Sequence, residues 1–362
     1  MSEDQHTDFE AQEAGGDHEG PTLYEHHRIV VDPKQGSVRL DKFLFDRIPN
    51  ISRNKIQRAI NAGSVLVDDQ AVKPNYKIRP REVITISLDR PPREDSPIAP
   101  ENIPLDIRYE DEDLLVVHKP AGMVVHPGIG VHSGTLVNAL AYHLQNSELP
   151  VMPGNLANRP GLVHRIDKHT TGLLVIAKTE MAMTHLAQQF FEHSIERKYL
   201  ALVWSEPEAD EGTVVGNIGR HPTLRTLMYV FSEGEDGKPA VTHYKVLERL
   251  YYVSLIECQL ETGRTHQIRV HLKYHGHPLF NDPKYGGNTI RKGTVYTKYR
   301  QFVENCFKVM PRQALHAKSL GFIHPRTGEE MYFEAPLPED FAAVMERWRH
   351  YVHHRKTQKE KE

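Results

Sequence analysis

The first regular pattern of apolar and polar positions lies between residues 38 and 88. In "VRLDKFLFDRI" the apolar side chains recur at helical spacing, at Leu40, Phe43, Leu44 and Ile48. A second helix is predicted in "SRNKIQRAINAG", between an N-cap at Ser52 and a glycine stop at Gly63. "SVLVDDQAVKP" and "EVITISL" follow with the pattern of short strands around a polar turn. Residues 38–88 are therefore predicted to form two helices packed on a small sheet.

Residues 105–352 form a second, larger region in which strand-like and helical patterns alternate. The strand-like runs are "DLLVVHKP", "GLLVIAK", "YLALVW" and "YVSLIECQL". Two amphipathic helices are predicted in "MTHLAQQFFEHS" and "EDFAAVMERWRHYV". Their core-facing side chains should be Met183, Leu186, Phe190 and Phe191 in the first helix and Phe341, Val344, Met345 and Trp348 in the second. Both strands and helices are therefore predicted in this region.

Three segments lack such patterns and flank or separate the two regions. Residues 1–27 are polar and acidic with few apolar side chains, so we expect them to be disordered. Residues 89–104, "DRPPREDSPIAPENIP", are rich in proline and charge, as expected for a semi-rigid linker. Residues 353–362 are expected to form a polar tail that frays.

Charge is distributed unevenly along the 362 residues, although the formal net charge is only −3. Residues 1–27 carry eight acidic side chains and no Lys or Arg. Residues 28–90 carry thirteen basic against seven acidic side chains, and residues 263–324 carry eleven against two. Two basic regions indicate a surface that binds a polyanion. Two solvated surfaces without such a partner would produce the same counts.

Several classes of protein are disfavoured by what the sequence lacks. Cys258 and Cys306 alone provide neither a disulfide framework nor a cysteine-based zinc site. There is no secretory signal and no apolar run of the ~20 residues that span a bilayer, so we expect a cytoplasmic protein. No Gly-x-Ser-x-Gly turn, dinucleotide fingerprint or Walker-type loop indicates a hydrolase or a nucleotide cofactor. No metal is expected, because His266 and His271 would not face one ion on either a strand or a helix.

The main candidate for chemistry is Asp167, in "RPGLVHRIDKHTTGLLVIAK" (159–178). It lies among the cations Arg165 and Lys168, directly before an apolar strand. In a structural interpretation, its carboxylate accepts backbone N–H bonds from the turn that follows. In a catalytic interpretation, a single carboxylate acts as nucleophile or base on a nucleoside held by a phosphate-binding surface.

A second group of polar side chains lies in "LETGRTHQIRVHLKYHGHPLFNDPKYG" (260–286). We predict a strand over residues 265–272, with a core-facing side made of Ile268, Val270 and Leu272. The opposite side would then carry Gln267, Arg269 and His271, a composition typical of an active-site floor. A half-exposed edge strand with a wet polar face is the alternative.

Three motifs of residues 38–88, "RLDKFL", "SRNKIQRAINAGSVLV" and "VKPNYKIRPREVI", stand at the positions of a known RNA-binding module. The segment resembles the S-four domain, named after ribosomal small-subunit protein four. The resemblance implies a helix pair that binds folded RNA by its phosphates, which supplies affinity rather than sequence choice. The RNA-binding side chains would be the cations of the second helix, Arg53, Lys55 and Arg58.

Six further motifs occur in order along residues 105–336: "VVHKPAGMVVHPG", "GTLVNALAYH", "GLVHRIDKHTTGLLVIAK", "ERKYLALV", "TGRTHQIRVHLKYHGHPLFNDPKYG" and "RQALHAKSLGFIHP". This set resembles the RluA-type RNA pseudouridine synthases, and within them the RluD branch. Ile166 and Thr171 are conservative departures from Leu and Ser. Residues 289–312 are less patterned and would be a substrate-specific insertion. The resemblance implies an α+β fold, in which a small S-four-like α+β domain is joined to a larger domain with a mixed, mainly antiparallel sheet flanked by helices.

The resemblance also implies a reaction and the residues that perform it. Uridine in folded RNA, in particular large-subunit (23S) ribosomal RNA or a ribosome precursor, would become its C-glycoside isomer without cofactor or metal. Asp167 would be the catalytic carboxylate, either attacking the sugar or removing a C2′ proton. Tyr199 would stack on the target uracil, and Arg269 would pair with Asp167 and keep it ionised.

Other residues would bind the substrate. Leu315 would form an apolar wall beside the base, and Gln267 and His126 complete the substrate-binding set. Stacked RNA hides the glycosidic carbon, so the base must be extruded. Arg165 would then occupy the vacated stack, although a contact with a phosphate is the competing interpretation.

Two other functions are compatible with parts of the sequence. A non-catalytic RNA-binding or ribosome-assembly protein would keep the fold, but the presence of Asp167, Tyr199 and Arg269 together argues against it. An RNA N-glycosidase would use the same carboxylate to release uracil, and would need a bound water and an exit for the base. We expect a monomer that has no membrane partner.

Overall fold

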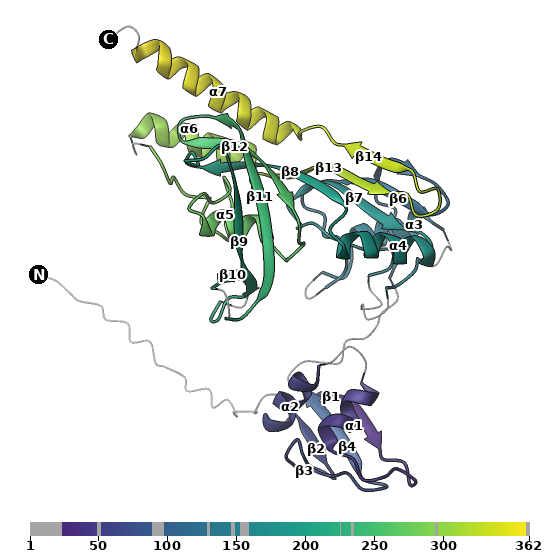
Figure 1. Cartoon of the computed structure of the whole chain (residues 1–362). Helices are drawn as coiled ribbons and strands as arrows, with labels where there is room; N and C mark the ends of the chain where they lie inside the picture. The colour runs from purple at the N-terminus through teal and green to yellow at the C-terminus, as the bar shows by residue number, and fades with distance from the viewer. Residues whose placement is uncertain are drawn as a thin grey trace, which may run out of the picture. The chain divides into compact units, whose positions relative to one another are not determined.

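The computed structural model describes residues 24–48, 52–88, 98–128, 131–145, 149–152, 159–224, 226–232, 235–293 and 296–359. Contacts divide the chain into two compact units, residues 1–96 and 97–362. Both units mix helices and strands, which confirms the α+β class (Figure 1). Within the described ranges, no helix has the length and apolar character needed to cross a membrane.

The first unit contains two helices and a four-stranded antiparallel sheet. Its elements are β1 (Tyr24–Val30), α1 (Leu40–Arg47), α2 (Arg53–Asn61), β2 (Val65–Val67), β3 (Gln70–Ala71) and β4 (Val83–Leu88), with strand order β1-β4-β2-β3. Ser52 caps α2 by accepting a hydrogen bond from the backbone N–H of Lys55, and Gly63 follows its end with a φ of 74°. The predicted helix pair and strands are therefore confirmed.

This unit begins earlier than predicted. β1 pairs with β4, so the expectation of disorder is wrong for residues 24–27, whereas residues 1–23 lie outside the described ranges. β1 is an edge strand, and Glu25, His27 and Arg28 are exposed. An edge strand with so many polar positions has little of the alternation from which a strand is predicted.

The second unit is built on one large sheet. Its elements are β5 (Asp106–Glu110), β6 (Leu114–Lys119), α3 (Leu136–His143), β7 (Thr171–Ala177), α4 (Glu180–Phe191), β8 (Glu196–Trp204), β9 (Glu211–Arg220), β10 (Met228–Phe231), β11 (Lys238–Arg249), β12 (Val253–Leu260), α5 (Gln267–Tyr274), α6 (Thr297–Val309), β13 (Leu315–Ile323), β14 (Glu330–Glu334) and α7 (Glu339–Lys359). The strand order is β10-β9-β11-β12-β8-β13-β7-β6-β5, with β14 beside β13. Among these strands only β13 and β7 pair in parallel, which confirms a mixed, mainly antiparallel sheet.

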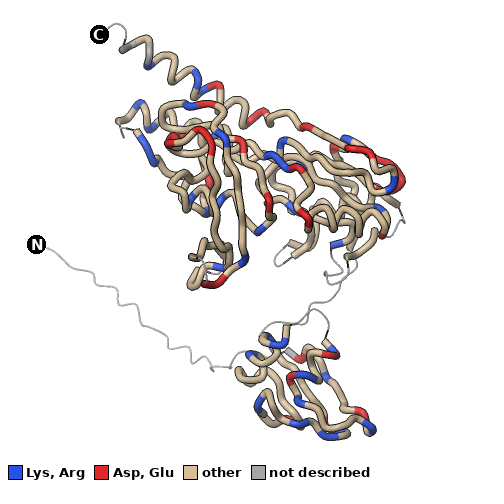
Figure 2. The backbone as a smooth tube through the Cα atoms, in the orientation of Figure 1, with Lys and Arg blue, Asp and Glu red and all other residues tan. Residues whose placement is uncertain are grey.

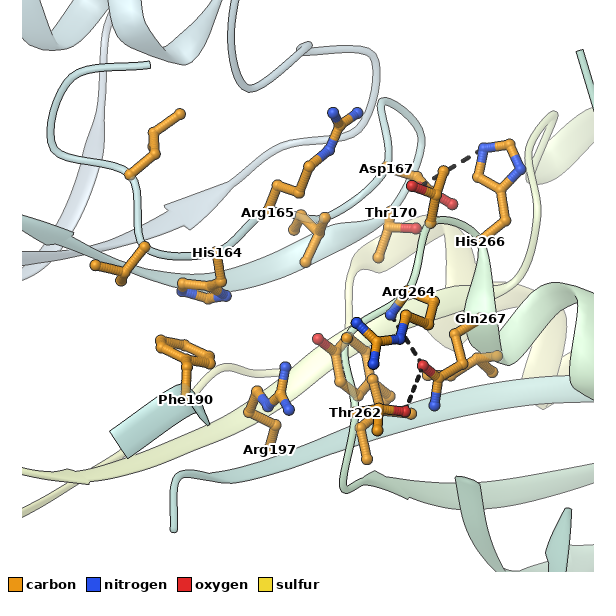
Figure 3. Close-up of a pocket in the computed structure, with 18 of the residues that line it drawn as sticks. His164, Arg165, Asp167, Thr170, Phe190, Arg197, Thr262, Arg264, His266 and Gln267 are labelled. Atoms are coloured by element: carbon orange, nitrogen blue, oxygen red, sulfur yellow. Dashed lines mark hydrogen bonds and ion pairs between the residues drawn. The ribbon is translucent and has the colours of Figure 1, made fainter. Parts of the chain in front are cut away.

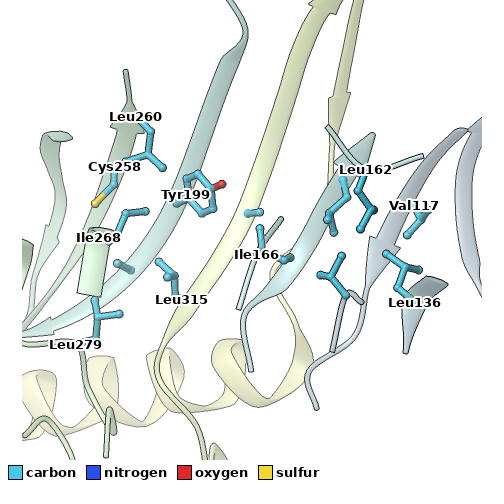
Figure 4. Close-up of a cluster of buried hydrophobic side chains, with 14 of the residues drawn as sticks. Val117, Leu136, Leu162, Ile166, Tyr199, Cys258, Leu260, Ile268, Leu279 and Leu315 are labelled. Atoms are coloured by element: carbon cyan, nitrogen blue, oxygen red, sulfur yellow. The ribbon is translucent and has the colours of Figure 1, made fainter. Parts of the chain in front are cut away.

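Each face of this sheet has its own hydrophobic core, because successive residues of a strand point to opposite faces. The odd-numbered residues of β8 from Tyr199 to Val203 pack in a cluster that includes α3 and α5 (Figure 4). The even-numbered residues from Leu200 to Trp204 pack with α6 and α7. The buried side chains of α7 are the predicted ones, Phe341, Val344, Met345 and Trp348.

Residues 98–104, predicted as part of a semi-rigid linker, pack against α3. The backbone N–H of Glu101 donates to the carbonyl of Asn138, and the Asn138 side chain donates to the carbonyl of Ala99 at 2.8 Å. The linker prediction is therefore wrong for residues 98–104, and residues 89–97 lie outside the described ranges.

Two smaller predictions also differ from the structure, and a third segment can now be described. α7 continues to Lys359, so the segment 353–359 is helical rather than frayed. Phe191, expected in the core, is 83% exposed at the end of α4. Most of residues 289–312 is α6, whose Tyr299, Val303 and Cys306 are buried in the α6–α7 core. That segment is therefore part of the domain's core.

Candidate active site

A cavity of about 630 Å³ brings together segments that are far apart in the sequence. It is lined by the loop before β7, the start of β8, the loop before α5, and α5 itself (Figure 3). All seven catalytic and substrate-binding residues expected from the sequence line it: His126, Arg165, Asp167, Tyr199, Gln267, Arg269 and Leu315. Its volume lies in the range of small-molecule sites.

Arg269 forms an ion pair with Asp167, as the resemblance implied. Its Nη1 donates to Asp167 Oδ2 at 2.8 Å, while its Nε and Nη2 donate to the two oxygens of Asp282 at 2.8 and 2.9 Å. Asp282 is fully buried and fixes the plane of the guanidinium, which then presents its remaining nitrogen to Asp167. The turn after Asp167 bonds to the backbone of this residue and not to its carboxylate, since the N–H of Thr170 donates to the Asp167 carbonyl at 3.1 Å. These contacts favour the catalytic interpretation of this side chain over the turn-capping one.

Asp167 is kept ionised by its surroundings. Burial by itself raises the pKa of this carboxyl, but the nearby His266 and Arg269 more than offset burial, and the pKa lies below its usual value. His266 Nε2 lies 3.8 Å from Asp167 Oδ1, and burial lowers the pKa of His266 to about 4. Because this imidazole is neutral at neutral pH, the cations that stabilise the Asp167 anion there are Arg269, which bonds to it directly, and Arg165.

The loop that carries Asp167 is anchored by a buried lysine. Lys119, at the end of β6, is fully buried and donates from Nζ to the carbonyls of Pro120, Met123 and Lys168 at 2.7, 2.9 and 3.1 Å. Burial lowers the pKa of Lys119 to about 7. Lys168 follows Asp167 directly, so this contact ties the catalytic loop to the neighbouring strand.

A glycine lets β7 approach β13 at the base of the same loop. Gly172 has a φ of 117°, and a Cβ built on it would lie 2.1 Å from the carbonyl oxygen of Ala317 in β13. A side chain at this position would push apart the two strands that pair in parallel there. The glycine of the Thr-Thr-Gly sequence after Asp167 is thus required by strand packing.

Tyr199 and Leu315 form an apolar wall of the cavity (Figure 4). They belong to adjacent strands, β8 and β13, and both are buried in the core that includes α5. Burial raises the pKa of Tyr199, so its phenol is protonated at neutral pH. An aromatic ring beside an aliphatic side chain can hold a planar base.

Arg165 and His126 lie together at the cavity. Arg165 is exposed, whereas His126 is buried. His126 Nδ1 donates to the carbonyl of Pro127 at 2.8 Å, so its Nε2 accepts from Arg165 Nη1 at 2.9 Å. Burial lowers the pKa of His126 to about 4, which keeps the ring a neutral acceptor. His126 therefore orients the Arg165 guanidinium.

The strand predicted over residues 265–272 is wrong, because residues 267–274 form the helix α5. Residues 267–272 are all buried, so the alternation of apolar and polar types does not separate a core face from a wet face. Gln267 begins the helix, and its amide bonds to Thr262, to the N–H of Arg264 and to β11 at Val241 and Thr242. These bonds give Gln267 a structural role in shaping the loop before α5.

The cations predicted to bind RNA are arranged unequally on α2. Arg53 donates from Nε and Nη2 to the buried Asp41, which also binds Arg39 and Gln57. Lys55 and Arg58 are exposed. Lys and Arg positions occur throughout this unit (Figure 2). Arg53 is exposed as well, but its guanidinium is oriented by Asp41.

One group of potential metal ligands occurs among the described residues, and none of its members lines the cavity. Its members Asp111, Asp113 and His324 offer atoms within 4.8 Å of one another. Each is already bonded within the protein: Asp113 to Arg326, and Asp111 to His324. These bonds account for the group as a structural network.

Several residues of the site carry no sequence signal of their own. Asp282 and Lys119 lie within the matching motifs but look like ordinary charged loop and strand-end residues. The Tyr285 hydroxyl forms a 2.7 Å hydrogen bond with His266 Nδ1 and accepts another from the N–H of Met228, and this fixes the imidazole. Arg197 lines the cavity two residues before Tyr199. For Lys119, the one feature of the sequence that could have drawn attention to it is a charged residue at the end of a buried apolar strand.

Comparison with known protein families agrees with this geometry. Residues 113–274 match the family described as RNA pseudouridylate synthase, and residues 38–84 match the S4 domain. A solved structure, human RNA pseudouridylate synthase domain containing 4, aligns with a TM-score of 0.50 and 26% identity, covering 67% of this chain and 92% of that one.

Curated relatives align over nearly the whole chain. An uncharacterized RNA pseudouridine synthase of Chlorobaculum parvum is 46% identical over 89% of this chain and 97% of its own length. YlyB of Bacillus subtilis, described in the same words, is 47% identical with the same coverage. Ribosomal large subunit pseudouridine synthase D of Nitrosomonas europaea is 43% identical over 90% of this chain and 88% of its own.

Proposed function

Because the chain belongs to the RNA pseudouridylate synthase family, we propose that it isomerises specific uridines of large-subunit ribosomal RNA, with Asp167 as the catalytic carboxylate. The choice of RNA is supported by several relatives at 41–45% identity that are named ribosomal large subunit pseudouridine synthase D. The observation that carries the proposal is the ion pair of Asp167 and Arg269, 2.8 Å long, in a cavity lined by Tyr199 and Leu315. We expect the protein to act as a cytoplasmic monomer.

The reaction balances without a cofactor. The N1–C1′ bond of uridine breaks, and its electron pair leaves with the base. The base turns, C5 bonds to C1′, the proton on C5 is lost, and N1 takes up a proton. Asp167 would assist either by attacking the sugar or by removing a proton from C2′, and both roles need an ionised carboxylate.

The base must leave the RNA stack to reach this carboxylate, at a cost of a few kcal/mol. Tyr199 and Leu315 would receive the extruded uracil. The exposed guanidinium of Arg165, oriented by His126, would fill the space that the base leaves, or else contact a phosphate. Salt dependence separates the two: a phosphate contact predicts that Arg165→Ala lowers the slope of log Kd against log salt by about 1, whereas filling the stack predicts weaker binding with a smaller change in slope.

Loss of the C5 hydrogen provides the assay. Ribosomal RNA carrying tritium at C5 of uridine should release tritium into water when it is incubated with the purified protein. Release of free uracil instead would identify the N-glycosidase. RNA binding without either release would identify the non-catalytic RNA-binding protein.

The first unit should bind RNA through phosphates. Changing both Lys55 and Arg58 to Ala should weaken RNA binding and lower the slope of log Kd against log salt, by about 1 for each phosphate that the variant no longer binds. The rate of a bound target should not change, since neither residue lines the cavity. Binding is measured by fluorescence anisotropy between 50 and 200 mM salt.

Lys34→Ala is the matched control, because Lys34 is an exposed cation of the same unit outside the helix pair. Unchanged affinity and slope in the double variant would show that α2 does not bind the RNA.

A further inference from the structure

Arg197 is a buried cation in the wall of the cavity. It belongs to β8, two residues before Tyr199, so the two side chains point to the same face of the sheet. It is 6% exposed and lines the cavity beside Phe190 and His164 (Figure 3). The ring centroid of Phe190 lies 5.0 Å from its guanidinium carbon.

No carboxylate of the described residues lies within ion-pair distance of this guanidinium. Among the same residues, its one hydrogen bond runs from Nη2 to the backbone carbonyl of Glu261 at 3.3 Å, and its Nε is buried without an acceptor. Burial lowers the pKa of Arg197, and the phenol of Tyr199 offsets this effect only in part. Two other buried guanidiniums of this domain differ, because Arg269 pairs with Asp167 and Asp282, and Arg312 pairs with Asp340.

A buried cation without a counter-ion costs several kcal/mol, which the substrate can offset if it brings negative charge to that position. Phe190 on one side and β8 on the other hold the guanidinium in place. Its unused donors therefore mark a position where an anionic or strongly polarised oxygen of the substrate is expected.

The position of Arg197 indicates which oxygen of the substrate it would bind. In Figure 3, Arg197 lies beside Phe190, whereas Asp167 lies apart from it, near Thr170 and His266. A uridine with its sugar at Asp167 and its base against Tyr199 would extend its far edge toward Arg197. A backbone phosphate would stay near the mouth, where Arg165 is exposed.

We infer that Arg197 donates a hydrogen bond to a carbonyl oxygen of the target uracil and stabilises the negative charge that the base carries once the N1–C1′ bond is broken. This rests on the proposed function. The electron pair of the broken bond spreads from N1 over both carbonyl oxygens. When C5 bonds to C1′, the C5 proton leaves and N1 gains a proton, so the base is neutral again and Arg197 releases it.

Arg197→Gln should lower the single-turnover rate by about 100-fold, the usual effect of removing one donor to a developing anion, while Kd for RNA changes less than about 3-fold. Replacing uracil O2 or O4 by sulfur, a weaker acceptor, should slow the wild-type protein at one of these positions. The same replacement should have little further effect on the variant. This substrate–variant cycle isolates the interaction between Arg197 and the base.

The controls separate this role from others. Thermal stability should be unchanged or raised in Arg197→Gln, because an unpaired buried charge is removed, and Arg197→Lys should restore part of the rate. Additive effects of both sulfur replacements would overturn the inference. Weaker RNA binding by Arg197→Gln, with a lower slope of log Kd against log salt, would also overturn it, because it would show that Arg197 binds a phosphate. An active wild-type protein in these experiments leaves the proposed function standing, whereas an inactive one contradicts both.

Discussion

Asp167→Asn is expected to form no measurable pseudouridine, with kcat lowered by at least about 10⁴-fold, as when a catalytic nucleophile or base is removed. The amide has the shape of the carboxylate but neither its charge nor its basicity. Arg269 keeps its two bonds to Asp282 in this variant, so the guanidinium and α5 should stay in place. RNA affinity should therefore change by less than about 3-fold.

Tritium release and RNA anisotropy measure the two quantities on the same preparation. Turnover within about tenfold of wild type would contradict either role of Asp167. Deuterium at C2′ of the target uridine then separates the two roles in the wild-type protein. A slower reaction would show that Asp167 removes the C2′ proton, and an unchanged rate would show that it attacks the sugar.

Arg269→Met should have the second largest effect, on both the reaction and the fold. The change leaves the buried Asp282 and the partly buried Asp167 without their cation, which should lower the free energy of unfolding by about 3–5 kcal/mol. It should also lower kcat by about 10²–10³-fold, because the carboxylate loses its orientation. Denaturant unfolding and single-turnover rates measure the two effects separately.

The pH dependence identifies the electrostatic part of this effect. In the wild-type protein the pKa of Asp167 lies below its usual value, so the carboxylate is ionised throughout pH 5–8 and contributes no acid limb there. Without Arg269, the cation bonded to Asp167 is lost and burial raises the pKa of this carboxyl against weaker opposition, so activity should fall as pH decreases into this range. Arg269→Lys keeps a positive charge beside Asp167, so its activity should not fall between pH 8 and pH 5. Lysine cannot, however, bond to Asp282 through two nitrogens. An identical pH profile in wild type and Arg269→Met would show that Arg269 does not hold Asp167 ionised.

Local patterns were sufficient for most of the helices and strands. The helix pair of residues 38–88 and the strands β6, β7, β8 and β12 have continuous apolar or alternating signals, and all were confirmed. The sequence did not reveal β1, because an edge strand needs few apolar residues. It did not reveal the packing of residues 98–104 either, because their bonds to α3 join segments that are far apart in the sequence. Phe191 follows the apolar spacing of α4 but lies just beyond the part of the helix that contacts the core.

The site shows a different limit. Besides the resemblance, a predicted strand face placed Arg269 at the site, whereas the side chain reaches Asp167 from a helix whose first six residues are all buried. Runs of six to eight mixed residues do not distinguish a strand from a buried helix by period alone. Asp282 and Arg197 could not be singled out either. The role of each depends on whether its buried charge has an oppositely charged partner. Packing between segments that are distant in the sequence decides which charges are paired.

The most direct test of catalysis by Asp167 is a carbodiimide map of pseudouridines in large-subunit ribosomal RNA from cells with and without this gene. We expect particular modification stops to disappear when the gene is removed, to return with the wild-type gene, and to stay absent with a gene encoding Asp167→Asn. Identical maps in all four strains, or stops restored by the Asn variant, would contradict the proposed reaction.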